Sequence, residues 1–178
     1  MQRAVSCVTE AVLGGRIYEA IDVPGVMAFA RRENGRLIEA PVPIGRGPHL
    51  LLSLRHIYQF RHVPEDAERG PWTVTSLAHS YELLDMNERR VIAYHWHPDT
   101  SLAFEPVHVG RQFAHSSLPA DVRTHAAALV RAHLPTGRIS LESVIRLAIR
   151  ELGVEPIKRE WEAILNETEE AFKRDRTP

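Results

Sequence analysis

The sequence has little of several features that would narrow its class at once. It has one cysteine in 178 residues, so an internal disulfide is not available and nothing indicates an oxidising compartment. It has no apolar run approaching the ~18 residues of a membrane-spanning helix, and its first residues lack the cationic and apolar regions of a signal peptide. Charge of one sign is not in excess, because 22 basic residues meet 23 acidic ones. These absences predict a cytoplasmic protein with no membrane segment, and they exclude a strongly basic coat for nucleic acid.

What remains is the composition of an ordinary globular domain with one chemical peculiarity. Apolar residues make up 44% of the chain and charged residues 25%, which is typical of a folded protein and not of a disordered one. The length predicts a single domain over residues 1–178, strand-rich over about 1–115 and helical over 116–174. The peculiarity is histidine, since the ten histidines all lie between His49 and His133.

Hairpins dominate the expected strand-rich part. The dipeptide Asn34-Gly35 lies between two extended segments in 26–42 and favours a tight turn. The apolar run 50–60 suits a strand, with a helix as the alternative. Two β-rich arms, 72–84 and 89–97, flank a turn at 85–88.

A four-residue turn at 85–88 would place His95 opposite Ala78. Tyr94 and Trp96 would then share the other face with His79. A further strand is expected over about 106–113.

After Phe113 the hydrophobic period changes from two to 3.6. We expect a helix over about 118–133, a second that begins after Ser140 and ends before Gly153, and a third that follows Pro156. The predicted fold class is therefore α+β, an antiparallel β-sheet of hairpins followed by about three C-terminal helices packed on one face.

The segment Tyr94-His95-Trp96-His97 carries the main functional signal, together with His108 eleven residues further on. Positions 95 and 97 of a strand project to the same side about 6 to 7 Å apart, so two imidazoles converge. One hypothesis is a metal site in which His95, His97 and His108 bind Zn, Fe or Ni and activate a water molecule. Pro98 interrupts the alternation that Asp99 would need to join this site.

A second hypothesis needs neither a metal nor a cofactor. Paired histidines can act as general base and general acid near neutral pH, which suits the cleavage of a phosphodiester. In this reading His95 and His97 form the acid/base pair and His108 supports them. Tyr94 and Arg111 would contact the phosphate, and Arg89 and Arg138 are further candidates because a guanidinium can hold the charge that develops on it.

Two readings without catalysis stay open. The histidines could line a half-exposed sheet face and bond to one another, to serine or to backbone. Alternatively the protein is an antitoxin-like or adaptor module that binds a partner through the helical part, with Arg146 and Arg150 or an exposed Trp161 as the contact.

A family resemblance adds to these readings. The stretches YELLDMNERRVIAYHWHPD, PVHVG and LPTGRISLESVIRLAIRELGVEP resemble an uncharacterised family of small bacterial proteins with a His-Trp-His-Pro strand motif. Their layout over about 75–165 is distantly similar to TumE-type toxin-antitoxin proteins, in which Tyr-Asp-Asn stands where this chain has Tyr94-His95-Trp96. Only Tyr94 and His108 match that pattern. The resemblance implies a toxin-antitoxin component with a cognate partner protein, and combined with the paired histidines it predicts a metal-independent ribonuclease acting on RNA.

Overall fold

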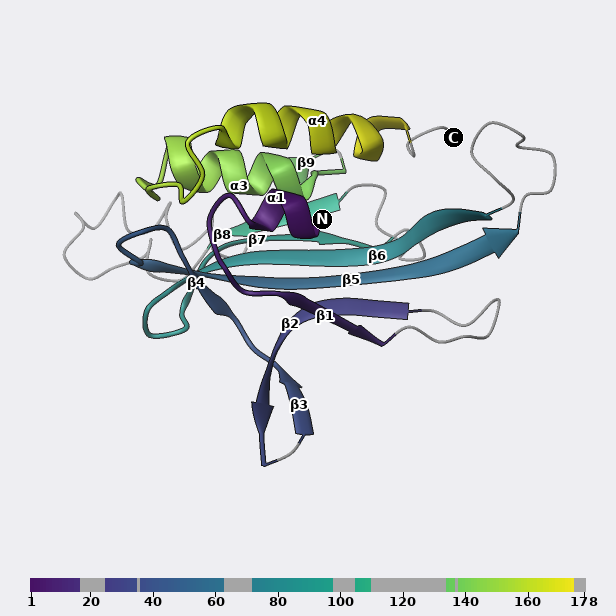
Figure 1. Ribbon diagram of the computed structural model, residues 1–178, viewed down its shortest axis with the longest axis horizontal. Coiled ribbons are helices and arrows are strands. Elements are labelled where there is room, and N and C mark those ends of the chain that lie inside the picture. Colours follow the sequence, from purple (N-terminus) through teal and green to yellow (C-terminus); the bar gives the residue numbers. More distant parts are fainter. Residues whose placement is uncertain are drawn as a thin grey trace.

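A long antiparallel sheet with helices along one side forms the described part of the protein (Figure 1). The structure is a computed structural model that describes residues 1–16, 25–34, 36–62, 72–97, 105–109, 134–136 and 138–174. In chain order its elements are α1 (Gln2–Val5), β1 (Leu13–Arg16), β2 (Gly25–Glu33), β3 (Arg36–Glu39), β4 (Val42–Ile44), β5 (Leu50–His62), β6 (Trp72–Asp85), β7 (Arg90–Trp96), β8 (Glu105–Val109), β9 (Leu134–Thr136), α3 (Leu141–Arg150) and α4 (Trp161–Arg174).

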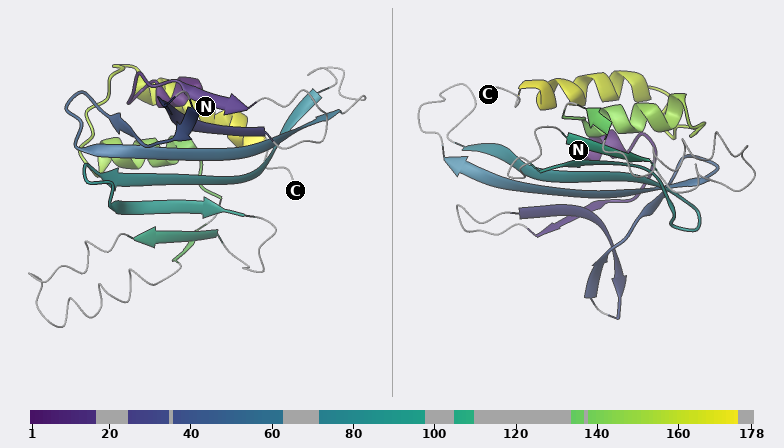
Figure 2. Two further views of the ribbon diagram at one scale, coloured as in Figure 1. Left: turned by 90° about the horizontal axis from the view of Figure 1, so that it is seen from below. Right: turned by 180° about the vertical axis from the view of Figure 1, so that it is seen from behind.

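The strands pair in the order β1-β2-β5-β6-β7-β8-β9, and all of these pairings are antiparallel. The short strands β3 and β4 pair with β2 and β5. Figures 1 and 2 show α1, α3 and α4 on the same side of this sheet. The α+β class and the C-terminal helices on one face are confirmed. Two of the three predicted C-terminal helices are α3 and α4, and the one expected over 118–133 lies outside the described residues.

The β2–β3 hairpin forms where the sequence predicts it. Glu33 pairs with Arg36, and Asn34 between them has a φ of 48°, the left-handed conformation that asparagine tolerates better than most residues. Figure 1 shows this hairpin projecting from the sheet on the side away from the helices.

The turn between β6 and β7 is tighter than expected. The amide of Glu88 donates to the carbonyl of Asp85 over 2.9 Å, and the amide of Asp85 donates to the carbonyl of Arg89 over 2.8 Å. Glu88 adopts a φ of 59°, which closes the loop with three residues instead of four. A bulge follows, because Leu84 pairs with Arg90 whereas Leu83 pairs with Ile92.

These two local features correct the predicted register by two residues. His95 lies opposite Ser80 and not opposite Ala78, and Trp96 lies opposite His79. Because side chains alternate with a period of two, a shift of two residues changes every partner but leaves each residue on its predicted face.

The structure has a strand at Leu134–Thr136, just after the range of about 118–133 in which the sequence predicts a helix. These residues form β9, an edge strand beside β8 in which Pro135 lies opposite Pro106. A proline cannot donate to a ladder and is tolerated at a sheet edge. This short strand lies within the range 116–174 that the sequence analysis described as helical, because the pairing with β8 is a tertiary contact that local pattern does not reveal.

The hydrophobic core lies between the sheet and the helices. The run 50–60 is strand, and alternate residues of β5 and β6 are at most 2% exposed, namely Leu52, Leu54, Tyr81 and Leu83. The side chains of α3 that pack on them follow the predicted spacing of an amphipathic helix: Leu141, Val144, Ile145 and Ala148. Burial of this apolar surface, at about 25 cal/mol per Å², holds α3 on the sheet.

Both ends of α3 are as the sequence predicts. The Ser140 hydroxyl accepts a hydrogen bond from the amide of Ser143 over 3.0 Å, which makes Ser140 the N-cap. Gly153, just past the last turn, has a φ of 71°, a conformation that a residue without Cβ adopts at little cost.

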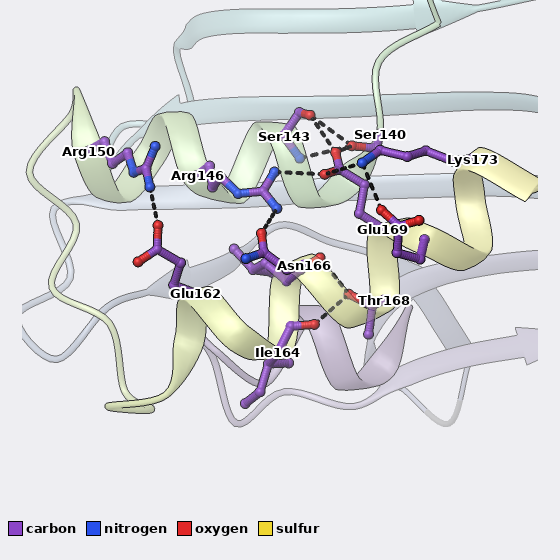
Figure 3. Close-up of polar contacts among 12 residues, drawn as sticks. Ser140, Ser143, Arg146, Arg150, Glu162, Ile164, Asn166, Thr168, Glu169 and Lys173 are labelled. Atoms are coloured by element: carbon purple, nitrogen blue, oxygen red, sulfur yellow. Dashed lines mark hydrogen bonds and ion pairs between the residues drawn. The ribbon is translucent and has the colours of Figure 1, made fainter.

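A polar seam joins α3 to α4, and Glu169 is its centre (Figure 3). Its carboxylate accepts hydrogen bonds from the hydroxyls of Ser140 and Ser143 over 2.6 and 3.0 Å, and Arg146 lies 3.1 Å from its second oxygen. Burial opposes ionisation of this carboxyl, but the two hydroxyls and the cations Arg146 and Lys173 outweigh it and lower the pKa of Glu169.

The same seam engages the arginines that the adaptor reading assigned to a partner. Arg146 also donates to the Asn166 side chain over 2.8 Å, and Arg150 is paired with Glu162 (Figure 3). Trp161 is partly buried against the core and lies 5.7 Å below the Arg150 guanidinium. Arg146, Arg150 and Trp161 are therefore engaged in contacts within the protein.

We expect Glu169→Gln to lower the free energy of unfolding at pH 7 by about 1 to 3 kcal/mol, because it weakens several hydrogen bonds to a partly buried charged group. The matched control is Glu170→Gln, since the Glu170 side chain is 63% exposed and pairs only with Lys173 within the described residues. Its substitution should change stability by less than ~0.5 kcal/mol. Urea titrations measure both values.

The stability difference between wild type and Glu169→Gln should depend on pH. A depressed pKa in the folded state stabilises the protein above the unfolded-state pKa of about 4.3 and ceases to do so as the pH falls through the folded value. The difference between wild type and Glu169→Gln should therefore shrink below about pH 4. A difference that stays constant from pH 7 to pH 3 would contradict the role given to this carboxylate.

Candidate functional site

The structure brings His95 and His97 together at the end of β7. Their ring centroids are 6.2 Å apart, with an interplanar angle of 18°, so the two imidazoles lie one beside the other in a nearly parallel arrangement. His95 is half-buried and His97 is exposed. Their neighbours Tyr94 and Trp96 face the helices, so alternation along β7 places both histidines on the face of the sheet away from the helices.

A carboxylate completes this cluster from the adjacent strand. Glu82 Oε1 lies 3.6 Å from His95 Nε2 and 3.2 Å from Arg90 Nη2. Only 19% of the Glu82 side chain is exposed, so this charge is poorly screened by water. We refer to Glu82, Arg90, His95 and His97 as the polar-face site.

Small residues flank the polar-face site in the sheet. Ser80 lies opposite His95, and Glu82 lies opposite Ala93 on one side and Ser53 on the other. Because Ser80, Ser53 and Ala93 are short, they leave space on this face around the longer side chains of Glu82 and His95.

Tyr94 lies on the other side of the sheet. It is paired with Tyr81, packs against the hydrophobic core, and has its pKa raised by burial. The structure therefore separates Tyr94 from the two histidines with which the sequence analysis grouped it.

The backbone of His108 is close to the site. In β8 it pairs with Ala93, two residues before His95 on the neighbouring strand, while its side chain lies outside the described part of the structure. Arg111 also falls outside the described residues.

Arg89 and Arg138, the two other candidates for binding a phosphate, make contacts away from the polar-face site. Arg89 is held at the β6–β7 turn by Asp85, with Nε 2.7 Å from Oδ2. The Arg138 guanidinium lies on the helix side of the sheet, 4.1 Å from the centre of the Trp96 ring and 4.8 Å from that of Phe172.

Sequence reasoning missed Glu82 and Arg90 because it lacked the register. With His95 opposite Ser80, Glu82 becomes the diagonal neighbour of His95 on the same face, whereas the predicted pairing kept the two apart. Finding Glu82 from the sequence would have required both the three-residue loop and the bulge at Leu84, which together set Ser80 opposite His95 and leave Glu82 on the same face.

No three His, Cys, Asp or Glu side chains are grouped as metal ligands among the residues that the structure describes. The third ligand of the metal hypothesis, His108, has no described side chain, so that hypothesis rests on the sequence pattern.

A second pair of histidines, on strands β5 and β6, occupies the helix side of the sheet. His56 and His79 are 8% and 2% exposed and stack with their rings 6.1 Å apart. His79 also stacks on Tyr81 at 4.5 Å, and Ser76 Oγ lies 3.1 Å from His56 Nε2. Within the described residues, neither Nδ1 atom of this pair has a hydrogen-bond partner.

This environment keeps both imidazoles neutral at pH 7. Burial, with the charge of Arg138, lowers the pKa of His56 to about 4. Burial, followed by the proximity of His56 and Arg138, lowers the pKa of His79 to about 3. A neutral, buried imidazole pair serves packing, so these histidines behave differently from His95 and His97.

Cys7, the single cysteine, is an inert core residue. It is 0% exposed, and burial raises the pKa of its thiol, which removes the thiolate that a nucleophile requires.

Among the described residues, none of the helices combines the length and the apolar composition that crossing a bilayer requires. The chain was compared with known protein families, with curated proteins and with solved structures, and none of the three comparisons found a match. The resemblance to TumE-type proteins therefore stays a prediction.

The buried pair predicts a loss of stability in mild acid. Unfolded histidine binds a proton near pH 6.5 and native His79 only near pH 3, so unfolding takes up a proton throughout that interval. Each such group should lower the free energy of unfolding by about 1.4 kcal/mol per pH unit as the pH falls from about 6 to 4.

The variant His79→Phe keeps a planar ring against Tyr81 and removes one titrating group. Its stability should fall less steeply with decreasing pH than that of the wild type, by about 1.4 kcal/mol per pH unit. Equal slopes for wild type and His79→Phe in urea titrations at pH 6, 5 and 4 would contradict a neutral buried His79.

Proposed function

We propose that this protein cleaves RNA without a metal ion, with His95 and His97 as its acid/base pair. The observation that supports the proposal is the pair itself, two imidazoles 6.2 Å apart on a sheet face, one of them beside a poorly exposed carboxylate. Neighbouring imidazoles that can exchange protons with one substrate are what phosphodiester cleavage by general acid and base catalysis needs.

RNA suits this chemistry because it carries its own nucleophile. One imidazole takes the proton of the ribose 2′-hydroxyl as the 2′-oxygen attacks the adjacent phosphorus. The second imidazole donates a proton to the 5′-oxygen as its bond to phosphorus breaks. The products are a 2′,3′-cyclic phosphate and a 5′-hydroxyl, and no cofactor is consumed.

The polar-face site contributes cationic charge near the reacting phosphate. Arg90 lies against Glu82 and keeps 46% of its side chain exposed, so its guanidinium remains accessible to a phosphate oxygen. His108 is a supporting residue in this proposal, because its backbone lies beside Ala93 in the next strand. Arg111 is retained from the sequence pattern alone, and Tyr94 is left out because it faces the core.

The biological setting is part of the same proposal. The resemblance to toxin-antitoxin proteins supports a toxin that acts on cytoplasmic RNA and is neutralised by a cognate partner protein. The near balance of 22 basic and 23 acidic residues favours local recognition of a scissile phosphate over broad electrostatic binding of RNA.

The direct test is cleavage of a fluorescent oligoribonucleotide in excess EDTA. The wild type should remain active, and His95→Ala and His97→Ala should each lose about 10²-fold or more in rate, the contribution typical of a general acid or base. His62→Ala, an exposed histidine on the distal end of β5, is the matched control and should keep wild-type activity.

Two results would overturn the proposal. Full activity in both His95→Ala and His97→Ala would remove the acid/base pair. Activity that disappears in EDTA and returns with Zn²⁺ would favour the metal hypothesis with His95, His97 and His108, and metal analysis of the purified protein would then show stoichiometric zinc. Circular dichroism of each variant establishes that the fold is retained.

A further inference from the structure

We infer that Glu82 is a positioning residue that holds His95 with its proton on Nε2 and so makes His95 Nδ1 the basic nitrogen of the site. This inference rests on the proposed function, and it assigns the two histidines different roles. His95 becomes the general base and His97 the general acid.

The contact that supports the assignment joins a carboxylate to one edge of the imidazole. Glu82 Oε1 lies 3.6 Å from His95 Nε2, a distance at which the interaction is electrostatic. A carboxylate only accepts, so an N–H at Nε2 is favoured beside it and a lone pair there is disfavoured. A neutral imidazole with its proton on Nε2 carries its lone pair on Nδ1.

The Glu82 side chain is held in place for this role. Its Oε1 is also 3.2 Å from Arg90 Nη2, and the side chain is 19% exposed. Pairing of Glu82 with Ser53 on one edge and with Ala93 on the other fixes its backbone in the middle of the sheet. Because the Glu82 side chain is held by Arg90 and its backbone by two neighbouring strands, the carboxylate stays directed at His95.

The same carboxylate favours the charged form of His95 once it has taken a proton. The imidazolium presents Nε2–H to Glu82, and the negative charge stabilises it, as in catalytic triads where a carboxylate orients a histidine base. His97 is exposed and its ring lies 6.2 Å from that of His95, which suits the group that delivers a proton to the leaving oxygen.

Among the described side chains, the charged and titratable groups around His95 come from β5, β6 and β7. On β7 they are Arg90 and His97, and on β6 there is Glu82 itself. The side chains of β8, the other neighbour of β7, lie outside the described part of the structure. On β5, Arg55 lies opposite Ser80, but its guanidinium is paired with Glu39 over 3.1 Å. Glu82 is therefore the carboxylate in contact with His95 among the described side chains.

The tautomer of His95 can be read directly. Long-range ¹H–¹⁵N correlation spectra distinguish imidazoles protonated on Nε2 from those protonated on Nδ1, and His95→Gln assigns the signal. In the wild type near pH 8, His95 should be in the Nε2–H form. Glu82→Gln should give a mixture or the other tautomer, because an amide can donate to Nε2 as well as accept from it.

Two further variants test whether the carboxylate itself matters. Glu82→Asp keeps an acceptor-only group and should keep the Nε2–H tautomer, which also shows that the strand tolerates a change at this position. Glu151→Gln, an exposed carboxylate at the end of α3, should leave the spectrum and the activity unchanged.

Kinetics complete the test. Glu82→Gln should lower kcat by about 10²-fold or more, in line with loss of the carboxylate that orients a histidine base, while KM changes little. An unaltered His95 tautomer in Glu82→Gln, or a wild type in the Nδ1–H form, would overturn the inference even if the protein is an active ribonuclease. An inactive wild type whose tautomer does depend on Glu82 would overturn the proposed function instead and leave the positioning of His95 by Glu82 in place.

Discussion

The pairing of β6 along both of its edges is the constraint on which the rest of the structure depends. β5 and β7 lie on either side of it, and their registers place His56, His79 and Trp96 in one row and Arg55, Ser80 and His95 in the next. Adjacent rows of an antiparallel sheet project to opposite faces. One strand pairing therefore sends neighbouring histidines either to the core beneath the helices or to the opposite face.

This separation gives the same residue type two kinds of chemistry. On the helix side, burial and Arg138 keep His56 and His79 neutral, so they act as flat packing groups, with His79 between Tyr81 and Trp96 and His56 stacked on His79. On the other face, His95 is beside the carboxylate of Glu82, which favours a protonated Nε2. The two faces of the sheet thus separate a buried structural pair, His56 and His79, from a candidate acid/base pair, His95 and His97.

Local sequence features predicted the elements well. Asn34 marks the β2–β3 turn, Ser140 caps α3, and Gly153 follows its end, because turn and cap geometry depends on a few adjacent residues. The β6–β7 register was predicted two residues out, since it depends on a left-handed Glu88 and on a bulge at Leu84 that a strand pattern does not reveal. β9 was missed for a similar reason, as Leu134–Thr136 is a strand only because β8 is beside it.

The class of the fold, the boundaries of its clearest helix and the shared face of His95 and His97 could all be predicted from the amino-acid sequence. All of these follow from periods of two and 3.6 residues and from caps and turns, which act over a few residues. Which groups meet the two histidines on that face depends on the pairing of distant strands. Glu82 is thirteen positions from His95 in the chain and contacts it through the register of two strands, a geometry set by one loop residue and one bulge. A period of two assigns a residue to a face but says nothing about its position along the neighbouring strand.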